Sequence, residues 1–432
     1  MVGLLRASWH TPGLRTKLPL AVLAVVVYRL GHHVPSPGVD VRAVRGAADA
    51  AVRDDPFVAL VDLVSGGGLL RLSMLGLGVF PCVAAVAVVH LLTQVHPRTR
   101  ALRTEGKEGA ARLGRYVLVL TAVWGALMAT ALVVAAGTRR LPGGDVLAST
   151  GGPTVVAMVG AMTAGAVVTA LLVRVLSGAA FGAGAALLFF VQVAAVFGGQ
   201  LAEIREVRGT VALIVAVGVV ALAALVVVVS LVVVGQAQRR VPVQYPKGMP
   251  VRRPAKTVYV PIRVCAVGAF PVRLALVLLF LPALVARLWP GGGRPGGVWT
   301  LPQQDSAWFL LALFALVVLV FPVSVAGTFD PGAIADRLHR EGAFVPGIRP
   351  GRPTAQYLSY VNRRITVCAP IVLGAAAVFP SAALALAGLG SGLALTGVSV
   401  LILVTAGTGL ALQLGRATET RIQVQRFAPF LR

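Results

Sequence analysis

The chain has 432 residues, of which 57% are hydrophobic and only 12% are charged. This apolar content exceeds what one globular core can bury, so it excludes an ordinary water-soluble domain. The net charge of +24 lies in short segments beside apolar runs, where it fits anionic lipid headgroups and soluble partners better than direct binding of nucleic acid.

Ten apolar runs are predicted to cross the membrane, since a helical span needs roughly 20 residues. Every backbone amide in lipid must find its partner within the protein, so these runs are expected to be helices. In chain order they lie near residues 18–34, 73–95, 116–137, 154–175, 180–198, 210–234, 265–288, 307–326, 365–388 and 392–415. The sequence therefore predicts an all-α membrane protein with ten transmembrane helices.

Lys and Arg gather in alternate connecting segments between these runs. If the N-terminus is cytoplasmic, most of them lie on the cytoplasmic side, and the positive-inside rule then places both termini there. The two longest cytoplasmic loops are residues 235–263 and 327–364. We expect these loops to project from the membrane as docking surfaces for a soluble partner.

The external segment 56–72 is moderately apolar and contains the flexible stretch Ser65–Gly68. Two structures fit this pattern, a segment that folds back into the membrane and a surface helix that lies in the interface. The pattern alone leaves both open.

Four strings follow one another along the chain. The first two are GHHVPSPGVD (Gly31–Asp40), preceded by Arg29, and LVDLVSGGGLLRLSMLGLGVFP (Leu60–Pro81). The other two are QAQRRVPVQYPKG (Gln236–Gly248) and VPGIRPGRPTAQYLSYVNRRIT (Val345–Thr366). In content and order they resemble the SecY family of protein-conducting channels. The second string resembles the plug and the start of the second helix, and the last two resemble the loops that bind cytoplasmic partners.

The resemblance implies two inverted five-helix halves, residues 1–205 and 206–432, around a central pore closed by a short plug. It implies a channel that translocates unfolded preproteins across the bacterial cytoplasmic membrane and releases apolar segments sideways into lipid, without bond chemistry of its own. The implied partners are SecE as a small membrane subunit with SecG as an optional second one, the SecA motor or the ribosome, preprotein signal peptides and anionic lipids. No cofactor is expected.

The resemblance also assigns roles to individual residues. The pore ring is expected at Val83, Ala87, Ala185, Phe189, Arg273 and Ile402. The plug is expected to include Phe57, Leu60, Leu63, Ser65, Gly66 and Gly67. Cytoplasmic partners are expected at Arg239, Arg240 and Arg349, and Cys265 is expected at the lateral gate.

Two of these positions depart from the family pattern. Arg273 replaces an aliphatic residue of the ring, where a guanidinium at the bilayer centre costs roughly 2.5–3.5 kcal/mol on insertion scales. Cys265 stands where the family has a gate asparagine. A divergent paralogue with restricted clients therefore stays open as an alternative.

A small-molecule or anion transporter of similar inverted-repeat architecture is the other alternative. None of the fifteen Asp and Glu residues lies in the core of a predicted span, which argues against ion coupling, although passage of an anion beside Arg273 stays open. An enzyme or a metal site is not expected, because the histidines and cysteines have neither ligand spacing nor neighbouring acidic groups.

Overall fold

The computed structural model describes residues 18–54, 56–95, 102, 106–137, 151–177, 184–244, 258–263, 271–276, 278–279, 306–326, 331–365, 367–388 and 395–427. The chain forms two compact units. Unit 1 comprises Met1–Leu213, Gly392–Leu395 and Gly409–Arg432, and unit 2 comprises Ile214–Ser391 and Thr396–Thr408. The predicted division into halves after residue 205 stays a prediction.

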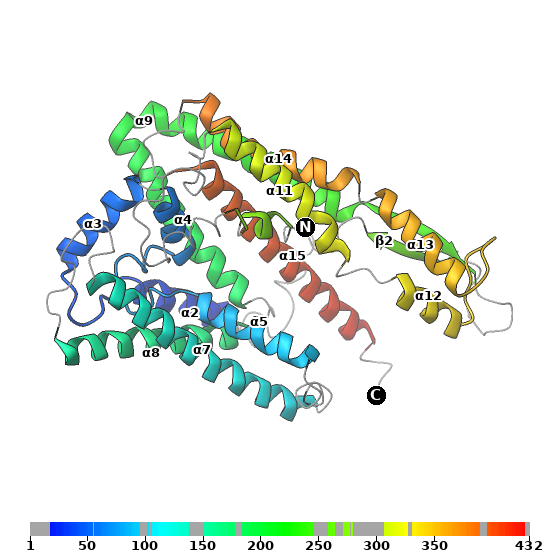
Figure 1. The fold of residues 1–432 in the computed structure, drawn as a ribbon, viewed down its shortest axis with the longest axis horizontal. Helices are drawn as coiled ribbons and strands as arrows, with labels where there is room; N and C mark the ends of the chain where they lie inside the picture. Colours follow the sequence, from blue (N-terminus) through cyan, green and yellow to red (C-terminus); the bar gives the residue numbers. More distant parts are fainter. Residues whose placement is uncertain are drawn as a thin grey trace, which may run out of the picture. The chain divides into compact units, whose positions relative to one another are not determined.

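Unit 1 contains the helices of the first part of the chain (Figure 1). They are α2 (Leu18–Gly31), α3 (Val41–Asp54), α4 (Pro56–Ser65), α5 (Phe80–Val95), α7 (Gly106–Gly137), α8 (Gly152–Leu176) and the beginning of α9 (Gly184–Gln236). The helices α7 and α8 pack closely because both present small residues. A Cβ on Gly125 would lie only 2.9 Å from the Cβ of Ala166. Small residues at such contacts are the usual means by which membrane helices approach each other.

Helix α9 is a 53-residue run interrupted by one non-helical residue, Gly209, with φ 85° and ψ 179°. This φ lies in the left-handed region that glycine adopts at little cost. The interruption falls between the predicted spans 180–198 and 210–234. The sequence thus breaks one long apolar helix at the point where the predicted spans are separated.

Unit 2 contains the apolar helices α11 (Ala307–Ala326) and α14 (Cys368–Leu386), together with the first part of α15 (Gly397–Phe427). The helices α11 and α14 lie side by side (Figure 1). Gly374 of α14 permits this approach, since a Cβ there would lie 2.9 Å from the ring of Phe314.

Unit 2 also contains a subdomain that the sequence did not predict. It consists of an antiparallel hairpin of β1 (Gln238–Val243) and β2 (Val258–Arg263), with α12 (Pro331–Arg340) and α13 (Arg352–Ile365). An isolated bridge joins Gln244 to Phe344. The buried core of this subdomain is Val241, Val243, Ile262, Leu338, Ala343, Val345, Leu358 and Val361. The two loops expected at 235–263 and 327–364 therefore fold together around one core. We call it the cytoplasmic subdomain after the side of the membrane predicted for these loops.

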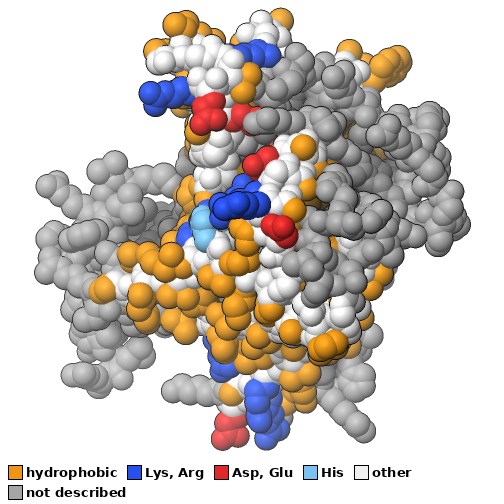
Figure 2. Space-filling model, turned by 90° about the vertical axis from the view of Figure 1, so that its left-hand side faces the viewer, with side chains coloured by type: hydrophobic (Ala, Val, Ile, Leu, Met, Phe, Trp, Pro, Cys, Tyr) orange, Lys and Arg blue, Asp and Glu red, His pale blue; other side chains and the backbone are white. Residues whose placement is uncertain are grey.

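Within the described residues, four helical stretches have the length and apolar composition to cross a membrane. They are Glu108–Val134, Gly152–Leu176, Gly184–Gln236 and Arg352–Leu386, and shorter apolar helices cover Pro19–Gly31, Phe80–Val89, Ala307–Pro322 and Gly397–Gln413. Many large apolar side chains on these helices are exposed, as lipid-facing residues would be, and Figure 2 shows them over a broad part of one face. The ten-helix count itself stays a prediction, because most of 265–288 lies outside the described residues.

One predicted boundary is wrong. The second span was expected to begin near residue 73, but α5 begins at Phe80 and the preceding residues form turns. The backbone explains the difference, because Leu72, just before the expected start, and Gly78, just before α5, have positive φ values of 47° and 60°. Hydropathy does not distinguish such an apolar turn from a helix.

Candidate functional site

The segment expected to form the plug is a short helix, α4, followed by a glycine turn. Leu63, Ser65, Gly66 and Gly67 are buried in unit 1, and Leu60 is half-buried. The side chain of Phe57 lies outside the described residues. The plug role of this segment stays a prediction, but its helix has a buried face and a defined end.

The segment after α4 lies against the residues that follow α2. The amide of Ser36 donates to the Leu72 carbonyl at 3.1 Å, and the amide of Met74 donates to the Val34 carbonyl at 2.9 Å. The same segment also lies against α8, where a Cβ on Gly165 would lie 1.9 Å from the Met74 carbonyl oxygen. The first two family-like strings of the sequence therefore lie together in unit 1.

Three polar side chains meet at the end of α4, and the sequence did not single them out as a group. Gln192 of α9 is fully buried; its Nε2 donates to the Val64 carbonyl, and its Oε1 accepts from the Tyr28 hydroxyl. His32 packs edge-on against the Tyr28 ring, with 4.5 Å between the ring centroids. Hydropathy marks Gln192 as an embedded polar residue, but no pattern in the sequence names its partners.

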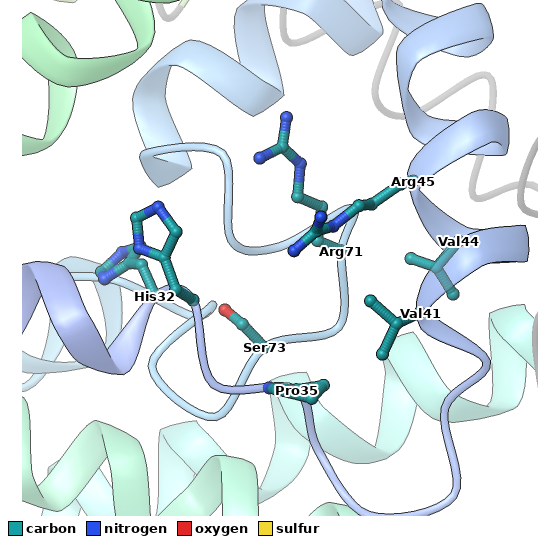
Figure 3. A pocket seen from close by; sticks show the side chains of 8 residues that line it. His32, Pro35, Val41, Val44, Arg45, Arg71 and Ser73 are labelled. Carbon is teal, nitrogen blue, oxygen red and sulfur yellow. The ribbon is translucent and has the colours of Figure 1, made fainter.

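A small cavity of about 30 Å³ lies beside the segment that follows α4, on the predicted external side. Figure 3 shows Arg45 of α3 and Arg71 of the segment after α4 along its wall, with His32 and Ser73 nearby. Arg71 also pairs with Asp49 at 3.5 Å, although both side chains are largely exposed. The cavity has room for about one water molecule.

Asp62 lies on α4, outside the predicted spans, and the residue is only 8% exposed. Burial raises its pKa from 3.8 to about 6, while Arg71 acts to lower this pKa and Asp49 to raise it further. A raised pKa means that the packed α4 binds a proton more tightly than a solvent-exposed α4 does. Packing of α4 is therefore favoured most below pH 4, and this advantage is lost as the pH rises through 6.

We therefore expect the exposure of α4 to depend on pH. Hydrogen exchange of its amides should accelerate as the pH rises from about 4 to 6, by up to tenfold per pH unit beyond the intrinsic dependence of exchange. Asp62→Asn should remove this additional acceleration. If the variant keeps the full pH dependence, another group is responsible.

The residues expected in the pore ring come from both units. Val83 and Ala87 lie one helical turn apart on α5 and are exposed, and Ala185 and Phe189 of α9 are half-buried. In unit 2, Arg273 is exposed and Ile402 is buried. Their assembly into a ring stays a prediction.

The residues expected to dock a partner lie in the cytoplasmic subdomain. Arg239 and Arg240 are exposed on β1, and Arg349 is exposed in the turn before α13. The Thr354 hydroxyl donates to the Arg349 carbonyl at 2.9 Å and fixes the backbone of this turn. The subdomain carries further exposed arginines to which the family resemblance does not point: Arg337, Arg340, Arg352, Arg363 and Arg364. Cys265, the expected gate residue, lies outside the described residues.

Comparison with known proteins gives consistent results. Residues 73–411 match the SecY family model. Protein translocase subunit SecY of Streptomyces galbus is 37% identical over 394 residues, which cover 87% of this chain and 88% of that protein. The same subunit of Mycobacterium tuberculosis H37Rv is 35% identical over 396 residues, which cover 88% of this chain and 89% of that protein.

Solved structures share the fold. One described as a protein-conducting channel has a TM-score of 0.53 at 16% identity and covers 93% of this chain and 92% of its own. Sec61 in a canine ribosome–channel complex has a TM-score of 0.52 at 15% identity, with the same coverage.

The fold and the family match define a multi-pass helical membrane protein of the protein-translocation channel class. The chain belongs to the SecY family. The expected all-α membrane architecture is confirmed, with the hairpin as an addition, and the small-molecule transporter alternative is not favoured.

Proposed function

We propose that this protein conducts unfolded preproteins across the cytoplasmic membrane of a bacterium and releases apolar segments sideways into the lipid. The observation that carries this proposal is the SecY family match over residues 73–411. The channel itself performs no bond chemistry. Energy comes from a cytoplasmic motor, from translation or from the membrane potential.

The proposed mechanism uses a narrow ring of mainly aliphatic side chains. Such a ring contacts an extended polypeptide on all sides but offers no ligand to a hydrated ion, so it limits leakage during transport. Its proposed members are the residues named above, with Arg273 as the departure. In the resting channel α4 and the following glycine turn form the plug.

The proposed partners follow from the distribution of charge and from the family. The exposed arginines Arg239, Arg240 and Arg349 fit an acidic surface of the SecA motor or the ribosome. SecE and SecG are proposed as small membrane subunits, signal peptides as the ligands of the lateral gate at Cys265, and anionic lipids as contacts of the basic loops. Both termini are proposed to be cytoplasmic.

A second candidate is a specialised paralogue with restricted clients. Arg273 favours it, because an aliphatic residue is expected at this ring position and a guanidinium would change both the polarity and the width of the constriction.

Complementation tests the proposed function. The host's own SecY is depleted, this chain is expressed, and viability and export of a signal-peptide reporter are scored, with membrane insertion verified. Rescue is expected for a general channel. A stably inserted chain that exports nothing would contradict this proposal and favour the specialised paralogue. Arg273→Ile should then restore export.

A further inference from the structure

The end of helix α4 is held in place by a glutamine from a distant helix. We propose that Gln192, oriented by Tyr28, is a positioning residue that latches the plug in its resting position. The proposal rests on the proposed function, since it assigns α4 to the plug. It is carried by the buried contacts of three segments of unit 1.

Gln192 is fully buried on an otherwise apolar stretch of α9, next to the buried Leu188 and Val193. An amide buried in such surroundings is costly unless it forms hydrogen bonds. Its Nε2 donates to the Val64 carbonyl and its Oε1 accepts from the Tyr28 hydroxyl. The side chain therefore uses both ends of its amide to connect α2, α4 and α9.

The contact contributes to the capping of α4. The last four carbonyl groups of a helix have no partner within it. The Asp62 carbonyl accepts from the Gly67 amide at 2.9 Å, and the Leu63 carbonyl accepts from the Gly66 amide at 3.3 Å. The Val64 carbonyl accepts from Gln192 instead. The end of the plug helix thus depends on a donor from outside its own segment.

Two glycines make room for this amide. A Cβ on Gly66 would lie 2.4 Å from the Gln192 Cγ, and a Cβ on Gly78 would lie 2.8 Å from its Oε1. Both glycines have a positive φ, of 81° and 60°. The turns before and after the segment 68–77 therefore close around the same side chain.

Tyr28 is held in turn by His32. The Nδ1 of His32 lies 3.0 Å from the Tyr28 carbonyl, and the two rings pack edge to face. Tyr28 is fully buried, so its hydroxyl has a fixed direction toward Gln192. When the plug leaves its resting position, Gln192 loses its hydrogen bond to the Val64 carbonyl. Among the described residues, Tyr28 is then its remaining hydrogen-bond partner. This loss is part of the free-energy cost of opening.

The test replaces Gln192 by leucine and uses Gln200→Leu as a matched control. Gln200 lies on the same helix and is also buried, and among the described residues neither of its amide atoms has a hydrogen-bond partner. The full chain is reconstituted in nanodiscs with its small membrane subunits, and hydrogen exchange is followed at the amides of residues 58–67. We expect exchange to accelerate about tenfold in Gln192→Leu, the effect of losing one buried hydrogen bond, and to stay unchanged in Gln200→Leu.

Equal exchange in the wild type and in Gln192→Leu would overturn the proposal, and so would equal acceleration in both leucine variants, which would indicate a general loss of helix packing. Tyr28→Phe removes only the hydroxyl and should accelerate exchange less than Gln192→Leu does. If Gln192→Leu does not accumulate, Tyr28→Phe alone decides the test. Exchange in Tyr28→Phe at the same rate as in the wild type would then refute the latch. Exchange does not depend on transport, so failure of the latch and failure of the channel function remain distinguishable.

Discussion

Reversing both arginines of β1, by Arg239→Glu together with Arg240→Glu, is expected to abolish motor-dependent translocation while membrane insertion stays normal. Both side chains are exposed on the cytoplasmic subdomain, so the reversal leaves its core intact. Loss of one partner of a buried, hydrogen-bonded charge pair at an interface costs about 2–5 kcal/mol, and reversal adds repulsion. The measurement is ATP-dependent uptake of a preprotein into vesicles that contain this channel and SecA.

The matched control is the double reversal Arg205→Glu with Arg208→Glu. These residues are also an exposed arginine pair, but they lie on α9 beside Gly209, on the predicted external side. This variant should transport as the wild type does, because a cytoplasmic motor does not reach it. Arg349→Glu should reproduce the loss. Unchanged uptake in the Arg239 and Arg240 variant would contradict the docking assignment.

The sequence predicts the apolar helices well because their signal is local. Helix α8 covers Gly152–Leu176 where 154–175 was expected, and α11 covers Ala307–Ala326 where 307–326 was expected. A run of about twenty apolar residues has few stable forms in a bilayer, so composition alone identifies it.

The cytoplasmic subdomain was missed because its core is assembled from distant parts of the chain. Val241 and Ile262 come from one loop, and Leu338 and Leu358 come from the other. Each loop alone has too few apolar residues to form a core, and the pairing of β1 with β2 becomes favourable when α12 and α13 cover one face. Because both loops are rich in charged residues, the sequence predicts docking surfaces there and gives no sign of a buried core.

The candidate site was predicted in part. The glycine turn after α4 is visible in the sequence as Ser65–Gly68, and its backbone confirms the turn. The hydrogen-bond partner of the Val64 carbonyl, just before that turn, is not visible in the sequence, because 128 positions separate Val64 from Gln192. A single sequence shows that a glutamine is embedded in an apolar span, but the tertiary fold decides what it binds.

The second large expected effect is a rise in the resting ion conductance when the plug is removed. Replacing residues 57–67 by a Gly/Ser linker of equal length is expected to raise the resting ion conductance of the channel by more than tenfold, because the loss of several buried contacts exceeds the loss of one hydrogen bond. The replacement ends before residue 68, so that the contacts of Leu72 and Met74 with the loop after α2 are kept. The measurement is the current across a planar bilayer without preprotein.

Replacement of the exposed residues Arg42, Gly46 and Ala50 of α3 by serine provides the control, and its conductance should stay low because the buried Val44, which packs with Leu72, is kept. The leak of Gln192→Leu should lie between those of the wild type and the plug replacement, since it removes one contact of the same segment. If the plug replacement conducts no more than the wild type, α4 does not seal the pore. In that case α4 is a surface helix in the membrane interface, which is the other structure that fits the sequence pattern.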